Sequence, residues 1–298
     1  MKPFVIISDS CCDLTIEERK QYDIEYLPMY CIYNDESHYA DLNWTEADRK
    51  AFYQMMRDGV RIRTAQITQR EYEAFFEEKL KNGYDILSIS CSSALSASVQ
   101  TSRKAKEELQ KRYPDAKIYC IDSLNACRGL GMICLTAAEL RAEGKSIDEV
   151  AEWVEEHKLE ANQECTPEKL TYLKQAGRVS AASAFFGGLL SIKPIIISDA
   201  KGRNLAVEKV KGRKNSLQRL VARMKERYRE VPYQKVAIAH ADCLEDAEAL
   251  RQEIVASIPE LEGKITITWL GPIIGATCGP GIVAIYFFGK KVEEGADE

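Results

Sequence analysis

Histidine is scarce in this sequence of 298 residues, with only His38, His157 and His240 present. The G-x-S-x-G elbow, which exposes a nucleophilic serine in many hydrolases, is absent as well. Only His240 follows a predicted strand, whereas His157 lies in a charged helical run and His38 in a polar loop. Because a serine nucleophile needs a nearby base, the sequence argues against serine catalysis, and we predict no catalytic residue.

The sequence also lacks the common phosphate-binding and metal-binding patterns. Neither G-x-x-x-x-G-K-[ST] nor G-x-G-x-x-G occurs, and the glycine-rich segment GPIIGATCGPG at 271–281 fits neither spacing. Ten cysteines are present, but none forms a C-x-x-C pair. We therefore expect no metal site and no cofactor.

Long hydrophobic runs and basic blocks are missing too. The longest apolar-rich stretch, 179–197, is interrupted by Gly187, Gly188, Lys193 and Pro194, which argues against a membrane span. The start, MKPFVIISDS, lacks the apolar region of a signal peptide and is typical of a first strand. With a net charge of −5 and no basic block, nucleic acid is a poor partner. We expect a cytoplasmic protein with reduced, buried thiols and no stable membrane insertion.

The first half of the chain alternates apolar runs with charged, periodic segments. Capping boxes, in which a hydroxyl and a glutamate satisfy the first amides of a helix, occur at Thr15, Thr68 and Ser146, each followed by Glu three residues later. This alternation predicts an α/β domain with a mainly parallel sheet flanked by helices. The strands are expected at 4–8, 24–33, 86–90 and 117–121.

The second half of the chain has a different order of predicted helices and strands, and we place a domain boundary near residue 160. The segment EANQECTPEK looks like a polar connection, followed by a helix over 167–175 with Thr166 as its N-cap. A hairpin is expected over 195–198 and 204–210, helices over 216–228 and 244–258, and strands over 235–239, 265–270 and 282–288. The prediction is therefore two α/β domains, 1–160 and 161–298, the second with a mixed sheet.

Small hydroxyl residues cluster where one predicted strand ends, in the segment LSISCSSALSASVQTS at 87–102. Ligands of α/β sheets collect at the carboxyl ends of strands. Three functions are possible for this cluster: it could supply a nucleophile, bind a phosphate, or bind another anion at a helix N-terminus. Plain helix capping explains one or two of the serines, but less easily the whole cluster.

Six motifs in this order resemble those of the DegV family of fatty-acid-binding proteins. Each motif is weak alone, but together they span residues 8 to 281 and hence most of the chain. They are S-D-S with D-L at 8–14, T-A-Q at 64–66, S-S-A-L-S-A-S at 92–98, D-S at 122–123, L-T-Y-L with G-R at 170–178, and G-P-I-I-G-A-T-C-G-P-G at 271–281.

The resemblance implies a protein that binds one long-chain fatty acid between its two domains and is not itself an enzyme. A separate ATP-dependent fatty acid kinase would convert the presented acid to an acyl phosphate for bacterial phospholipid synthesis. Thr64 and Ser93 would donate to the carboxylate, with Ser92 and Ser96 as neighbours or caps. Arg178 would lie near the mouth of the pocket, and Thr277 near the head group.

The sequence departs from the family pattern at several positions. Thr277 replaces a histidine, Ala65 and Ile67 replace a serine and a proline, and Lys211 stands where many members have arginine. Two alternatives follow: an acyl or phosphoryl enzyme that uses Ser93 or Asp9, or a regulatory member without lipid. Residues of the apolar segment are candidates for the tail tunnel or for ordinary core: Phe185, Phe186, Leu189, Leu190 and Ile192.

Overall fold

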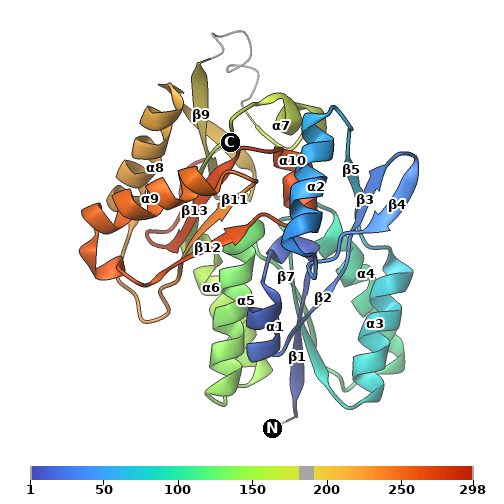
Figure 1. Cartoon of the computed structure of the whole chain (residues 1–298). Coiled ribbons are helices and arrows are strands. Elements are labelled where there is room, and N and C mark those ends of the chain that lie inside the picture. Colours follow the sequence, from blue (N-terminus) through green and yellow to red (C-terminus); the bar gives the residue numbers. More distant parts are fainter. Residues whose placement is uncertain (1, 181–190, 297–298) are drawn as a thin grey trace.

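The computed structural model describes residues 2–180 and 191–296, which form two α/β domains packed side by side (Figure 1). The apolar positions 185, 186, 189 and 190, which are candidates for the tail tunnel or for ordinary core, lie outside these residues. A search of the described helices found none that is both long and apolar enough to cross a membrane.

The N-terminal domain is built on a parallel four-stranded sheet, as predicted, with the strand order β2-β1-β6-β7. Helices α3 and α4 contact each other beside β6 and β7, while α5 and α6 pack against the sheet as a second pair. Figure 1 shows the two pairs on opposite sides of the sheet. The strands are β1 (Phe4–Asp9), β2 (Ile24–Leu27), β6 (Asp85–Ser90) and β7 (Ile118–Asp122).

The C-terminal domain contains a mixed six-stranded sheet with the order β10-β9-β8-β13-β11-β12, which confirms the expected mixture of parallel and antiparallel pairs. Helix α8 contacts β8, β9, β10 and β13, and α9 contacts β11 and β12. The strands are β8 (Ala161–Thr166), β9 (Ile192–Ser198), β10 (Asn204–Lys211), β11 (Val236–His240), β12 (Ile265–Trp269) and β13 (Val283–Phe288).

The helices begin largely where the sequence signals place them. The three predicted capping boxes are present at Thr15, Thr68 and Ser146, and a fourth joins Thr45 to Asp48 at the start of α2. The helices are α1 (Ile16–Gln21), α2 (Glu46–Arg57), α3 (Gln69–Lys81), α4 (Ser98–Arg112), α5 (Cys127–Ala142), α6 (Ile147–His157), α7 (Thr171–Ala176), α8 (Arg213–Arg227), α9 (Leu244–Ser257) and α10 (Pro272–Cys278), with short 3₁₀ turns η1 (Ser10–Cys12), η2 (Lys158–Glu160) and η4 (Pro259–Leu261).

Helix α5 joins the two domains. It contacts β1, β2 and β6 of one sheet and β8 and β13 of the other. Residues 127 to 138 are all buried, and the one charged residue among them, Arg128, is paired with Glu18. Because this helix belongs to both interiors, one hydrophobic cluster extends from Phe4 in β1 to Phe288 in β13.

The predicted strand over 24–33 is wrong in one respect, because it is divided at Pro28. Proline lacks the amide that would continue the ladder, and the next amide, that of Met29, donates to Oγ of Ser10 at 2.8 Å. The chain then enters a separate antiparallel sheet with the order β4-β3-β5. Its strands are β3 (Tyr30–Tyr33), β4 (Glu36–Tyr39) and β5 (Arg63–Ala65).

The expected polar connection after residue 160 is also wrong, since it forms the buried strand β8. Its polar residue Glu164 is satisfied by Arg223 of α8, whose Nε lies 2.6 Å from Oε2 of the carboxylate. Thr166 consequently ends a strand instead of capping a helix, and α7 begins five residues later at Thr171. Strand β8 pairs with β9 and β13, so a polar segment lies inside the sheet.

Candidate ligand-binding site

A cavity of about 430 Å³ lies between the two domains, near the carboxyl ends of β1 and β6. This volume is in the range of small-molecule sites in proteins. Residues from both domains line it: Cys11, Met29, Thr64, Ala65, Gln66, Cys91, Leu95, Ser96, Ala97, Ala126, Cys127, Gln163, Cys165, Leu173, Arg178, Ile196, Asn204, Leu270, Ile273, Ile274, Thr277, Cys278, Ile282, Ala284 and Tyr286.

Most of the cavity wall is apolar, and five of its residues are cysteines. All ten cysteines of the chain are unpaired and eight are buried, as the sequence predicts. Burial raises the pKa of the Cys278 thiol to about 12 and that of Cys165 well above its usual value. These thiols are therefore neutral at physiological pH and act as small apolar groups.

Among the described residues that line this cavity, Arg178 is the only charged one. Its Nε donates to the carbonyl oxygen of Leu95 at 2.8 Å, and its Nη1 donates to that of Ala176 at 2.9 Å. Leu95 belongs to the turn that carries the serine cluster, so Arg178 fixes the C-terminal domain to that turn. Among the residues described by the structure, none accepts a hydrogen bond from Nη2 of Arg178.

The structure brings four of the predicted site residues together at this cavity: Thr64, Ser96, Arg178 and Thr277. Oγ1 of Thr277 donates to the carbonyl oxygen of Ile273, one turn earlier in α10, at 3.0 Å. Oγ of Ser96 lies 2.8 Å from Oγ of Ser98. The Thr64 hydroxyl, by contrast, has no hydrogen-bond partner among the described residues, so it is available to a ligand.

Ser92 and Ser93 are not among the residues that line the cavity, although they lie in the same turn as Leu95 and Ser96. Oγ of Ser92 donates to the carbonyl oxygen of Gly202 at 2.8 Å, so this side chain joins the two domains. The backbone amide of Ser93 donates to Oδ1 of Asp122 at 3.1 Å. Its hydroxyl has no partner within the described part of the chain, and its role as a carboxylate donor stays a prediction.

Sequence reasoning missed the polar residues that the C-terminal domain supplies. Gln163 of β8 and Asn204 of β10 both line the cavity, and Nε2 of Gln163 donates to Oδ1 of Asn204 at 3.2 Å. Nδ2 of Asn204 donates in turn to the carbonyl oxygen of Arg178 at 3.0 Å. The sequence ANQECT at 161–166 has three consecutive polar residues and no apolar–polar alternation, so no local signal identifies this strand.

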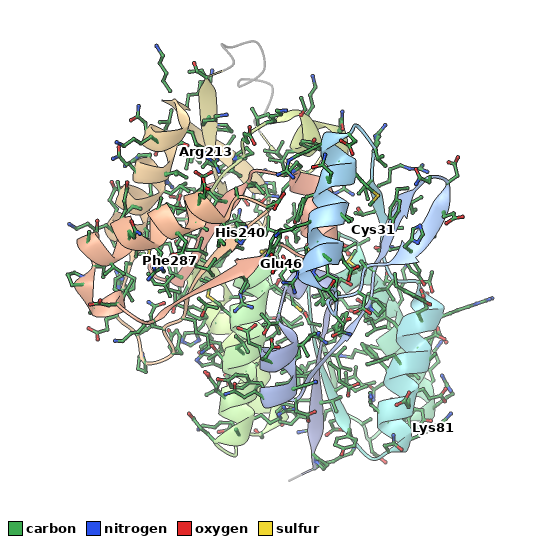
Figure 2. All side chains as sticks on the ribbon, viewed as in Figure 1. Cys31, Glu46, Lys81, Arg213, His240 and Phe287 are labelled. Atoms are coloured by element: carbon green, nitrogen blue, oxygen red, sulfur yellow. The ribbon has the colours of Figure 1, made fainter. Side chains whose placement is uncertain are left out.

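None of the three histidines lines the cavity. His240, labelled in Figure 2, is buried at the end of β11, and burial lowers its pKa to about 4. Its Nδ1 accepts a hydrogen bond from the amide of Cys243 at 3.3 Å. Asp9 accepts from the amides of Cys11 and Cys91 at 2.9 and 3.0 Å and does not line the cavity. The geometry therefore offers Ser93 no histidine base.

Lys211, which departs from the family pattern, and the nearby Arg213 do not line the cavity. Lys211 is exposed at the end of β10. The guanidinium of Arg213, labelled in Figure 2, lies 2.7 Å from Oδ2 of Asp246 and also donates to the carbonyl oxygen of Gly281 at 2.7 Å. Arg213 is thus held in place by contacts within its own domain. No group of three or more metal-ligating side chains was found among the described residues.

The fold and the cavity define a two-domain α/β protein with a mostly apolar site between its domains, whose described lining includes several polar residues and one cation. A family model described as "Uncharacterised protein, DegV family" matches residues 3–290, and the chain belongs to this family. A DegV domain-containing protein of Clostridium perfringens is 40% identical over 98% of this chain and 100% of its own length.

Solved structures of the family share the fold. A DegV family protein of Thermus thermophilus, whose structure is described as showing fatty acid binding, aligns with a TM-score of 0.84 and 25% identity, over 97% of this chain and 100% of its own. DegV of Bacillus subtilis, described as a fatty acid binding protein, aligns with a TM-score of 0.80 and 27% identity over the same shares. DegV-family neighbours of this chain therefore bind fatty acids.

Proposed function

We propose that this protein binds a long-chain fatty acid in the cavity between its domains, with the carboxylate at the end lined by Thr64 and Arg178. The observation that carries the proposal is the cavity itself, whose described lining is mostly apolar but includes hydroxyl groups, the side-chain amides of Gln66, Gln163 and Asn204, and one cation, Arg178. An anionic head group with an apolar tail fits this distribution. The fatty acids bound by the family neighbours support it.

The tail supplies most of the expected affinity. Each buried methylene contributes about 0.8 kcal/mol, so a tail of about fifteen carbons contributes on the order of 12 kcal/mol before ordering costs. A hydrogen bond to a charged carboxylate contributes about 1.5–3 kcal/mol. The head-group contacts therefore set the orientation of the lipid, and loss of one donor weakens binding without abolishing it.

The proposal includes a partner, a separate ATP-dependent fatty acid kinase that acts on the acid presented by this protein. The protein itself would carry no catalytic residue, which agrees with the absence of a histidine from the cavity wall. Its place is the cytoplasm, where the acyl phosphate enters phospholipid synthesis. Incubation of the lipid-loaded protein with such a kinase and ATP should yield a lipid that is heavier by one phosphate group.

Native mass spectrometry of the purified protein, followed by organic extraction, tests the binding. We expect one fatty acid per chain in the wild type. The double variant Thr64→Val/Ser93→Ala should retain less lipid, with a dissociation constant raised roughly tenfold or more, because it loses two free hydroxyl donors. Ser37→Ala, an exposed serine on β4 outside the cavity, is the matched control and should retain the wild-type amount.

Two outcomes would contradict the proposal. A wild-type protein that stays free of lipid after incubation with C16 and C18 acids would favour the regulatory alternative. That alternative expects an empty or collapsed cleft, and the structure has an open cavity there. Covalent labelling of Ser93 by a serine-reactive phosphonate would favour the enzymatic alternative.

A further inference from the structure

A separate cavity of about 270 Å³ lies where the segment before α1 and the start of α2 meet the end of β12. We call it the interface pocket, because residues of both domains line it. The N-terminal domain contributes Asp13, Trp44 and Arg49, and the C-terminal domain contributes Thr268 and Trp269. None of the described residues that line the interface pocket also lines the first cavity, so the two are different sites.

Three polar side chains of the interface pocket have buried atoms without a hydrogen-bond partner among the described residues. These atoms are both carboxylate oxygens of Asp13, Nε of Arg49 and Oγ1 of Thr268. Asp13 is 5% exposed and Thr268 is 7% exposed. Buried polar groups in folded proteins almost always have a partner. The convergence of three such side chains on one pocket therefore indicates a small polar ligand.

The negative charge of Asp13 is not paired with the arginine that lies nearest to it along the buried helix α5. Nη1 and Nη2 of Arg128 lie 2.6 and 2.5 Å from the two carboxylate oxygens of Glu18, and Nη1 also donates to the backbone carbonyl oxygen of Asp13 at 3.2 Å. Burial raises the pKa of Asp13 to about 7, although the Cys127 thiol, the Gly271 amide and Arg128 lower it. Above that pH the carboxylate is an anion that lacks a cationic partner.

Arg49 brings the opposite charge to the same pocket. Within residues 2–180 and 191–296, its side chain forms no hydrogen bond and no ion pair. The third charged residue of the lining, Glu17, is exposed on α1, so water satisfies its carboxylate. A ligand with only an ammonium would leave Arg49 without a counter-charge, and a ligand with only an anionic group would leave Asp13 without one. The two side chains together therefore match a zwitterion.

The remaining wall of the interface pocket is mostly apolar. The indoles of Trp44 and Trp269 line it together with aliphatic side chains such as Leu42 and Ile267. Small-molecule sites commonly combine an apolar wall with a few polar groups that fix the orientation of the ligand. An apolar side chain on the zwitterion would occupy this part of the pocket.

We propose that the interface pocket binds an α-amino acid with an apolar side chain, whose ammonium faces Asp13 and whose carboxylate faces Arg49. The Thr268 hydroxyl supplies one further hydrogen bond. This inference does not use the first cavity and stands apart from the proposed function. It gives the chain a second ligand of a different chemical class, bound where the two domains meet.

Intrinsic fluorescence measures the binding, because Trp44 and Trp269 are two of the three tryptophans of the chain. The wild type is titrated at pH 8, where Asp13 is mostly ionised. The probes are L-leucine and L-phenylalanine, together with two truncated forms of leucine: 4-methylpentanoate, which lacks the ammonium, and 3-methylbutan-1-amine, which lacks the carboxylate. We expect each truncated form to bind roughly tenfold or more weakly than L-leucine, because it loses one charged partner.

Two variants assign the two ends of the ligand. Arg49→Gln should bind L-leucine roughly tenfold or more weakly but 3-methylbutan-1-amine at least as well as the wild type. Asp13→Asn should also lose L-leucine, yet bind 4-methylpentanoate at least as well as the wild type. Arg70→Gln on α3 and Asp35→Asn change exposed residues outside the interface pocket and are the controls, which should bind L-leucine like the wild type.

The proposal is overturned if the wild type binds neither L-leucine nor L-phenylalanine at about 10 mM, which would mean that water alone satisfies the unpaired groups. It is also overturned if L-leucine and its truncated forms bind equally well, or if Arg49→Gln binds all of them like the wild type. Circular dichroism checks the folding of each variant. Should Asp13→Asn fail to fold, the probes on the wild type and on Arg49→Gln still decide, because Arg49 is only half-buried.

Discussion

At the scale of single residues, Asp13 stands out as a buried carboxylate where the two domains meet. It is 5% exposed, and a Cβ atom added to Gly271 of the other domain would lie 2.1 Å from its Oδ1. No described group donates a well-formed hydrogen bond to either of its carboxylate oxygens. Burial therefore disfavours the charged form and raises the pKa of Asp13 to about 7.

This shift predicts a pH dependence of stability. Because the folded state holds the proton more tightly than the unfolded state, the contribution of Asp13 is fully present below about pH 4 and is lost as the pH rises to about 7. Asparagine tolerates the left-handed φ of 48° at position 13. In the variant Asp13→Asn, the free energy of unfolding should therefore fall less than in the wild type between about pH 4 and pH 7. Urea midpoints from pH 4 to pH 8 measure the difference.

The control for this variant is Asp35→Asn. Asp35 has a similar φ of 59° but lies exposed in the turn between β3 and β4, so its replacement should leave the pH profile as in the wild type. Parallel profiles for Asp13→Asn and the wild type would show that the buried carboxylate is not the titrating group.

At the scale of elements, strand β8 depends on a buried ion pair. Nε of Arg223 lies 2.6 Å from Oε2 of Glu164, whose side chain is 1% exposed, and Nη1 lies 2.8 Å from Oε1 of Glu208. Removal of one partner from a buried pair typically costs about 3–5 kcal/mol, because the other charge is left without compensation. Arg223→Ala should therefore lower the free energy of unfolding by about that amount in urea titrations.

Two further variants make this prediction specific. Arg229→Ala changes an exposed arginine just beyond α8 and should alter the stability by less than about 0.5 kcal/mol. The double variant Glu164→Leu/Arg223→Leu replaces the pair by apolar groups and should recover most of the loss. A double variant as unstable as Arg223→Ala would mean that packing, and not the unpaired charge, causes the effect.

At the scale of the whole molecule, the turn between β9 and β10 joins the two domains. Oγ of Ser92 donates to the carbonyl oxygen of Gly202, and Oγ of Ser198 donates to that of Leu124 at 3.0 Å. A Cβ atom at Gly202 would lie 2.1 Å from Oγ of Ser92 and 2.9 Å from Cα of Leu124. This contact holds the serine turn in place next to the cavity between the domains.

Gly202→Ala should therefore destabilise the protein and weaken lipid retention together. Gly263→Ala is a close control, because Gly263 has the same φ of +72° but no atom within 4 Å of an added Cβ. Both variants bear the strain of a left-handed alanine, about 1–2 kcal/mol. The clash should lower the free energy of unfolding of Gly202→Ala by about 1–3 kcal/mol more than that of Gly263→Ala. Thermal unfolding with and without fatty acid measures this difference. Equal losses in the two variants would show that the turn contributes little to domain contact.

The sequence by itself determined most of the elements and the position of the hydroxyl cluster. Capping boxes, apolar runs and strand-end motifs depend on residues within a few positions of one another, so they act before the domains pack. This is why the parallel sheet and the mixed sheet were predictable, whereas Thr64, Ser96, Arg178 and Thr277 were assigned to a site only through the resemblance to the DegV motifs.

Only the tertiary structure decided the remaining features. Strand β8 is a strand because Arg223, 59 residues away, neutralises Glu164. Ser92 holds the domains together because Gly202, 110 residues away, presents its carbonyl oxygen. Arg61, Arg63 and Arg178 line one cavity of about 510 Å³ because the segment that enters β5 and the segment after α7 meet there. Each of these features depends on partners that are distant in sequence, so the neighbouring residues alone do not predict it.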